Sequence, residues 1–156
     1  MLDTGVIVAL LDASEAAHRR CVEAVVHLDR PLVTCEAVIA EACYLTRALD
    51  GAASAILRNV ERNVFRIPFH ISEHAPNVMK ALRKYADVPA AFADACLIVM
   101  AETLSTGDIL TLDNDFRVYR WARSQPFRNL LDEATFRPDA SSGYGRQKSR
   151  ARTADA

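Results

Sequence analysis

Residues Val88–Ala101 read VPAAFADACLIVMA, and Asp94 is the only charged or strongly polar side chain in this stretch. The run predicts a buried helix extending to Leu104, with Asp87 as its cap and Pro89 near its first turn. An ionised carboxylate in an apolar surrounding is heavily penalised unless a cation, a donor network or a bound proton accompanies it. Asp94 therefore indicates either a buried hydrogen bond or a metal site.

Composition and charge are those of an ordinary globular protein: 156 residues, 51% hydrophobic, 25% charged, net charge −1. No apolar run reaches the roughly 18 residues of a membrane span, so we expect no membrane association. The start MLDTG lacks a basic flank before an apolar stretch, and we expect no secretory signal and a cytoplasmic location. No CxxC pair is present, so the cysteines are expected to be reduced core thiols: Cys21, Cys35, Cys43 and Cys96.

Short apolar runs alternate with helix-like segments along the chain. The strand candidates are Met1–Asp3, Leu32–Thr34, Val64–Pro68 and Ile109–Leu112, and Arg117–Trp121 fits either a further strand or a short helix. Strands separated by helices predict an α/β fold, which we expect to be a three-layer α/β/α domain with a central, mainly parallel sheet of four or five strands. Residues 1–138 would form this domain. Residues 139–156 are basic and poor in large apolar side chains, which predicts a disordered tail that is either a solvated end or a contact for RNA phosphates.

The intervening segments predict helices from their apolar spacing. Ser14 is a candidate N-cap for a helix ending near Leu28. A helix over Glu36–Leu49 and one over Ala52–Asn63 follow. A further helix begins at Ser72 and runs to about Tyr85, which would place Pro76 in its first turn.

Four carboxylates are placed to meet. Asp3 and Asp113 each follow a strand candidate, and the carboxyl ends of parallel strands share one rim of a sheet. Glu41 lies three residues after Val38 and four before Leu45, so it shares a helix face with apolar residues. With Asp94, these side chains could form an oxygen-rich pocket, and oxygen ligands suit Mg²⁺ or Mn²⁺.

Electrostatics favours a cation in such a pocket. Two carboxylates about 4 Å apart repel each other by roughly 4 kcal/mol at an effective dielectric constant near 20. Each residue also has a simpler interpretation. Asp3 could cap a helix beginning near Gly5, Glu41 could lie on a helix surface, and Asp113 begins a polar turn. The conjunction of the carboxylates is more specific than any one of them.

Four segments resemble PIN-domain ribonucleases, in particular the VapC-type toxins of bacterial toxin–antitoxin pairs. They are LDTGVIVALLD at the start, the helix of Glu41, ADACLIVMAE and TLDNDF, and the resemblance covers roughly Met1 to Leu131. It implies that the catalytic quartet is Asp3, Glu41, Asp94 and Asp113. The supporting residues that it implies are Thr4, Thr111 and Asp115.

The sequence and this resemblance together predict a metal-dependent endoribonuclease. Asp3, Asp94 and Asp113 would hold Mg²⁺ or Mn²⁺, and Glu41 would orient the attacking water or a second ion. A basic rim for the RNA would come from arginines whose other interpretation is a solvated surface: Arg19, Arg20, Arg117, Arg120 and Arg123. The resemblance also implies a homodimer and a partner antitoxin that blocks the site.

Two features depart from the family pattern. Only Met1 and Leu2 precede Asp3, which leads us to expect a weakened strand edge there. Ala91 stands where many relatives carry an acid. A catalytically weak or inactive PIN-like module that binds RNA or a protein is therefore the alternative. A phosphotransfer domain fits less well, because Gly5 stands where phosphatases of that type need a second Asp.

Overall fold

The computed structural model describes residues 1–28, 31–88 and 90–134. The α-helices of this part are α1 (Thr4–Leu11), α2 (His18–Val26), α3 (Glu36–Leu45), α4 (Ala52–Glu61), α5 (Ile71–Lys84), α6 (Phe92–Leu104) and α7 (Leu130–Ala134), with one 3₁₀ helix, η1 (Asn114–Arg117). The strands are β1 (Leu32–Val33), β2 (Phe65–Arg66), β3 (Asp108–Ile109), β4 (Arg120–Trp121), β5 (Gln125–Pro126) and β6 (Arg128–Asn129). The predicted tail, 139–156, and the last residues of the predicted domain, 1–138, lie outside the described residues.

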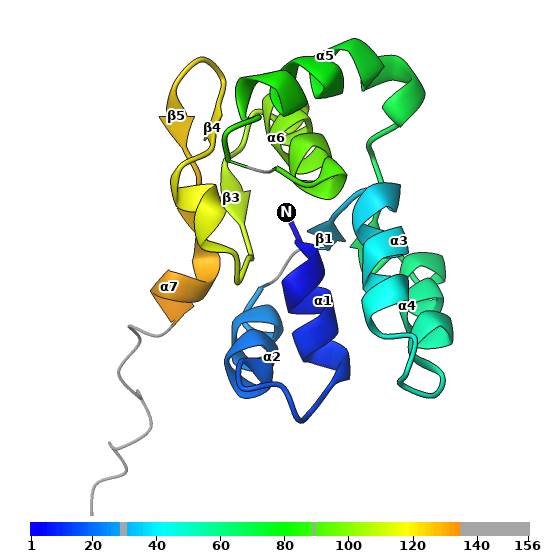
Figure 1. Ribbon diagram of the computed structural model, residues 1–156. Coiled ribbons are helices and arrows are strands. Elements are labelled where there is room, and N and C mark those ends of the chain that lie inside the picture. The colour runs from blue at the N-terminus through cyan, green and yellow to red at the C-terminus, as the bar shows by residue number, and fades with distance from the viewer. Residues whose placement is uncertain (29–30, 89, 135–156) are drawn as a thin grey trace, which may run out of the picture.

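Strand pairing is short and mostly parallel. β1 pairs with β2 and β3 pairs with β6, both in parallel, whereas β4 and β5 form an antiparallel hairpin. Met1–Asp3 lies between the two parallel pairs, and Figure 1 marks the N terminus between β1 and β3. The amide of Leu2 donates to Val33 O at 2.8 Å, and the amide of Asp3 donates to Leu110 O at 3.1 Å. The first residues are therefore bonded on both sides, and the expectation of a weakened strand edge at Asp3 is wrong.

The α/β class is confirmed, but a single central sheet of four or five strands is not. Among the described residues, strand pairs form three two-stranded sheets, and Leu2 contributes only an isolated parallel bridge to Leu110. The physical reason lies in the chain just after Leu2. Asp3 caps α1, so the backbone leaves the strand conformation before a longer ladder can form.

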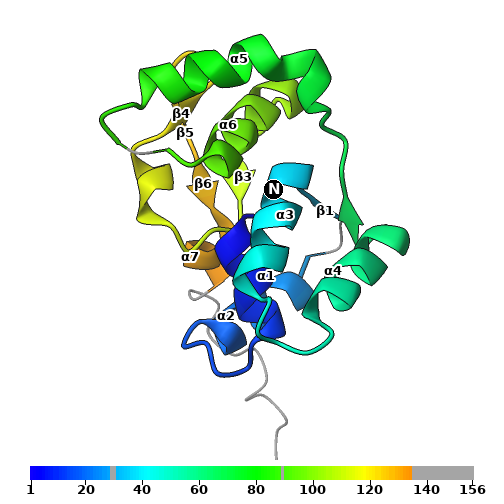
Figure 2. The same ribbon diagram turned by 45° about the vertical axis from the view of Figure 1, so that its right-hand side comes forward.

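α6 is the buried centre of the fold. Every residue from Ala93 to Ala101 is buried, including Asp94, as the apolar run predicts. α5 packs along α6 in both views (Figures 1 and 2), and α3 contacts α6 as well. α1 packs against α2 and α3, and α2 packs against α7. In the described part of the chain, no helix has both the length and the hydropathy needed to cross a membrane.

Three expected helix starts are wrong in detail. Ser14 does not cap α2, because its amide and hydroxyl both donate to Asp12 Oδ1 in a local turn. α6 begins at Phe92 with Ala91 as the N-cap, so Asp87 is not its cap. α5 begins at Ile71, which places Pro76 beyond the first turn. The apolar spacing identifies these helices, whereas local polar contacts decide where they begin.

Candidate active site

Asp3 occupies the junction between the first strand segment and α1. It is the N-cap of α1, and its Oδ1 accepts from the amide of Thr4 at 2.6 Å. Its Oδ2 accepts from the hydroxyl of Thr111 at 2.6 Å. Only 5% of Asp3 is exposed. The capping interpretation of Asp3 is therefore confirmed, and one carboxylate oxygen is held by a residue from the far end of the domain.

Thr4 connects Asp3 to Glu41. While its amide bonds Asp3, its hydroxyl donates to Glu41 Oε2 at 2.7 Å. Glu41 is half-buried on α3, where Val38 is fully buried. Leu45 is 51% exposed, so its predicted place on the buried face is wrong. Glu41 lies at the boundary of that face, where its carboxylate reaches the N terminus of α1.

Asp94 lies in the first turn of α6. Its Oδ2 accepts from the amide of Ala91, the N-cap, at 3.0 Å, which is the reciprocal bond by which an acidic third residue satisfies a free helix amide. The Tyr119 hydroxyl donates to the same oxygen at 3.5 Å. Asp94 thus has the buried hydrogen bond that its setting demands, and one of its oxygens has no protein donor among the described residues.

Asp113 follows the end of the β3 segment. Its amide donates to Thr111 Oγ1 at 2.9 Å, and its Oδ1 accepts from the amide of Asp115 at 2.8 Å, which caps η1. Thr111 therefore donates to Asp3 and accepts from Asp113 through one hydroxyl. The polar-turn interpretation of Asp113 is confirmed, and the same turn lies next to Asp3. Asp113 itself is exposed.

The four carboxylates share one electrostatic environment. The pKa of Asp94 is raised to about 6, mainly by burial, with the bond from Ala91 opposing the rise and the negative charges of Asp3, Asp113 and Glu41 adding to it. Burial also raises the pKa of Asp3, with Asp113 and Glu41 acting in the same direction and the bonds from Thr111 and Thr4 opposing them. Each of these carboxylates comes from a different segment. The fold therefore brings the predicted quartet within electrostatic range.

A metal ion would fit this donor set in chemistry and charge. Within residues 1–28, 31–88 and 90–134, no three His, Cys, Asp or Glu side chains are already grouped closely enough to hold one. The carboxylates are near enough to raise one another's pKa, and a cation would remove that repulsion. Their oxygen-only chemistry suits Mg²⁺ or Mn²⁺ better than zinc.

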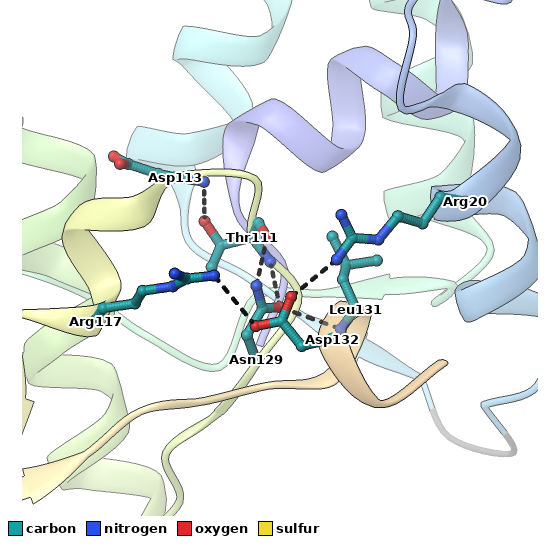
Figure 3. Close-up of polar contacts among 7 residues, drawn as sticks. All are labelled: Arg20, Thr111, Asp113, Arg117, Asn129, Leu131 and Asp132. Carbon is teal, nitrogen blue, oxygen red and sulfur yellow. Dashed lines mark hydrogen bonds and ion pairs between the residues drawn. The ribbon is translucent and has the colours of Figure 1, made fainter. Parts of the chain in front are cut away.

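Two residues that the sequence did not single out hold this site in place. The side chain of Asn129 accepts from the amide of Leu131 at 3.1 Å and donates to Thr111 O at 2.9 Å (Figure 3). Its Oδ1 also accepts from the amide of Thr111 at 3.4 Å. Tyr119 is fully buried beneath Asp94. Asn129 is the last residue of β6, a strand that the sequence did not predict, so its place at a strand end was missed.

Four of the five predicted RNA-binding arginines have intramolecular partners, and Arg123 is the exception among the described residues. Arg20 donates to Asp132 Oδ1 at 2.9 Å, and Arg117 lies 3.8 Å from Oδ2 of the same residue (Figure 3). Arg19 pairs with Glu23 on the surface of α2. The Nη1 group of Arg120 donates to three backbone carbonyl groups, those of Arg117, Val118 and Tyr119. Their role toward RNA stays a prediction.

Comparison with known proteins supports the same assignment. The PIN domain family model matches residues 1–122. Ribonuclease VapC26 of Mycobacterium tuberculosis is 30% identical over 115 residues, which are 72% of this chain and 85% of that protein. The crystal structure of VapC20, a sarcin-ricin loop cleaving toxin of Mycobacterium tuberculosis, superposes with a TM-score of 0.69 at 20% identity, covering 80% of this chain and 98% of that one.

The match to the family model extends from the first residue through Asp3, Glu41, Asp94 and Asp113, so it includes every member of the acidic quartet. The likeness to VapC20 independently supports the fold. The identity to VapC26 extends over most of both chains. The chain therefore belongs to the PIN-domain family, among its VapC-type members.

Proposed function

We propose that the protein is a metal-dependent endoribonuclease, the toxin component of a type II toxin–antitoxin system. The observation that carries the proposal is the convergence of four acidic residues from four separate segments: Thr4 and Thr111 connect Asp3, Glu41 and Asp113, and Asp94 lies within electrostatic range of all three. The proximity of these carboxylates to one another is itself destabilising, because each carboxylate raises the cost of ionising the others. Function is the reason to keep them together, and the ribonuclease name of the VapC26 relative supports RNA as the substrate.

Asp3, Asp94 and Asp113 would hold Mg²⁺ or Mn²⁺. When bound, the ion would acidify a water molecule and neutralise charge on the phosphate during in-line attack. Glu41 would orient the attacking water. Thr4 fixes the Glu41 carboxylate, and Thr111 fixes one oxygen of Asp3, so these hydroxyls keep the acidic side chains in place before RNA arrives. Asp115 supports the turn through its amide.

The partners follow from the same assignment. A VapC-type toxin is expected to act in the cytoplasm on RNA and to be inhibited by a cognate antitoxin, and we extend the prediction of a homodimer to this protein. Size-exclusion chromatography with light scattering tests the dimer. Co-expression with the product of a small adjacent reading frame tests the antitoxin, because inhibition of cleavage by that product requires a specific complex.

The direct test is cleavage of a labelled RNA with Mg²⁺ or Mn²⁺. The wild type should cleave, EDTA should abolish cleavage, and Asp94→Asn should reduce it by at least a hundredfold, since the substitution keeps the accepting oxygen for Ala91 but removes the charge. Asp50→Asn, at an exposed turn residue, is the matched control and should remain active. Equal activity in the wild type and Asp94→Asn, or full activity in EDTA, would contradict the mechanism.

The relatives do not favour the alternative of an inactive PIN-like module. Calorimetry with Mn²⁺ separates the two readings. The nuclease should bind the ion with a heat that Asp94→Asn removes, whereas an inactive module should show no such heat in either protein.

A further inference from the structure

A concave surface lies along α6, beyond the acidic site. It is a cavity of about 570 Å³ between α5, α6 and the turn that follows β4. α5 contributes Lys80 and Lys84, α6 contributes Glu102, and the β4 segment and its turn contribute Arg120 and Arg123. Figures 1 and 2 show α5 and α6 side by side, with the β4–β5 hairpin next to them. We name it the basic cavity.

The basic cavity has a surplus of positive charge. Four cationic side chains line it with one carboxylate, that of Glu102. Among the described residues, Lys80, Lys84 and Arg123 have no carboxylate at ion-pair distance. Arg120, in contrast, already donates to backbone carbonyl groups. The cavity therefore has cationic groups available to an anion. Arg20 and Arg117, in contrast, are already paired with Asp132.

The wall of the basic cavity is fixed by the fold. The Tyr85 hydroxyl donates to Arg120 O at 3.2 Å and accepts from the amide of Arg120 at 2.9 Å, which holds β4 against α5. Ala122 and Arg123 have φ values of 35° and 73°, in the left-handed region that side chains other than glycine rarely adopt. The hairpin keeps this conformation and presents Arg123 at the cavity.

We propose that the basic cavity binds phosphate groups of the RNA strand that the acidic site cleaves, so this inference rests on the proposed function. Ile98 and Glu102 of the cavity follow Asp94 by four and eight residues on α6, which is about 6 and 12 Å along a helix. A stacked strand advances about 3.4 Å per nucleotide. The cavity would thus hold phosphates about two to four nucleotides from the scissile bond.

The two sites are also in physical contact. The Tyr119 ring packs edge-on against Tyr85 at a centroid distance of 4.9 Å, and the Tyr119 hydroxyl reaches Asp94. Tyr85 lines the cavity. Because an acidic quartet repels the phosphate backbone, cations a few nucleotides away would supply the attraction that the cleavage site lacks.

The test measures RNA affinity in EDTA by fluorescence anisotropy, with a labelled, 2′-O-methylated 12-nucleotide single strand and the full chain. Lys80→Gln with Arg123→Gln should weaken binding at least fivefold and lower the slope of log affinity against log salt by about 1.4, at roughly 0.7 per phosphate contact in a single strand. Arg58→Gln with Arg62→Gln removes the same charge from exposed positions on and just after α4 and is the matched control.

A third variant gives the opposite sign. Among the described residues, Glu102 is the only carboxylate that lines the cavity, so Glu102→Gln should strengthen binding severalfold, a gain that misfolding cannot produce. We call Lys80→Gln with Arg123→Gln the cavity variant. Equal losses of RNA affinity in the cavity variant and in the Arg58→Gln, Arg62→Gln control would overturn the proposal, and so would an unchanged RNA affinity of the cavity variant. A different result would also overturn the proposal: the cavity substitutions weaken the binding of inorganic phosphate but leave RNA affinity unchanged. The cavity would then be assigned to a free phosphorylated ligand.

Cleavage assays separate this inference from the proposed function. With metal present, the cavity variant should cleave a dinucleotide as the wild type does and should cleave the 12-nucleotide strand with a raised KM, because only the longer RNA reaches the cavity. If the wild type does not cleave RNA but the cavity variant binds RNA more weakly than the wild type in EDTA, the proposed nuclease activity is refuted and the RNA-binding role of the cavity stands. If the wild type cleaves RNA in a metal-dependent way but the cavity variant binds RNA as tightly as the wild type, only the RNA-binding role of the cavity is refuted.

Discussion

The hydroxyl of Thr111 donates to Asp3 Oδ2 at 2.6 Å, across 108 residues of sequence. The hydroxyl oxygen of Thr111 also accepts from the amide of Asp113 at 2.9 Å. The hydroxyl of Thr111 thus links Asp3, at the end of the first strand segment, to Asp113, which follows β3. It supports a buried carboxylate whose pKa burial raises, and it places that carboxylate beside the turn that carries Asp113.

Thr111→Val tests this role. The substitution keeps the shape of the side chain but removes the donor to Asp3 and the acceptor for Asp113, so we expect the free energy of unfolding to fall by about 1–3 kcal/mol. Urea denaturation measures it. Thr103→Val removes a hydroxyl that bonds only the preceding turn of α6, at Val99 O, and should change stability by no more than about 0.5 kcal/mol. Equal effects would contradict the role of Thr111.

Asn129→Ala tests the support behind Thr111. The amide group of Asn129 satisfies backbone groups of Thr111 and Leu131. Its loss leaves partly buried backbone groups without partners, so we expect a destabilisation of about 1–3 kcal/mol. Asn129→Ser, which restores one short polar group, should recover part of it. Unchanged midpoints of urea unfolding for both variants would show that solvent replaces the bonds of Asn129.

The proximity of the predicted carboxylates could be anticipated from the sequence because two simple rules hold here. Asp3 and Asp113 follow strand segments that are parallel neighbours, so they reach one rim. Asp94 was found from its apolar surroundings, which do form the buried helix α6. These rules need only the order of the elements and the polarity of each segment.

The supporting contacts could not be predicted in this way. Asn129 and Tyr119 act through bonds to residues 18 and 25 positions away, which only the tertiary fold brings close. The start of α2 depends on whether Ser14 bonds its own helix or Asp12, and both choices satisfy its hydroxyl. The extent of the sheet depends on how soon Asp3 turns the chain into α1.

Asp94→Asn should stabilise the metal-free protein in a pH-dependent way. Burial raises the pKa of Asp94 from 3.8 to about 6. Between these values the folded protein binds more protons than the unfolded chain, so stability contributed by Asp94 falls as pH rises through this window and is lowest above it. The asparagine at position 94 of the variant has no proton to gain or lose in this pH range. Its advantage should be on the order of 1–2 kcal/mol at pH 7.5 and should shrink toward pH 4.

Thermal unfolding in EDTA at pH 4, 5.5 and 7.5 measures the difference between Asp94→Asn and the wild type. The control is Asp50→Asn, which removes a carboxylate from an exposed turn outside the acidic site. If the advantage of Asp94→Asn were constant with pH, or grew toward pH 4, the raised pKa of Asp94 would be refuted.

Gly107→Ala tests how the hairpin is held on the β3 segment. A Cβ atom at Gly107 would overlap the indole nitrogen of Trp121, which donates to Pro126 O at 3.1 Å. The indole must move, so we expect a loss of about 1–3 kcal/mol in stability and a red shift in the emission of the single tryptophan. Gly5→Ala is the control, because its Cβ would meet Leu112 at an ordinary 3.6 Å and should leave the emission unchanged. An unshifted spectrum for Gly107→Ala would mean that Trp121 does not pack on Gly107 in solution.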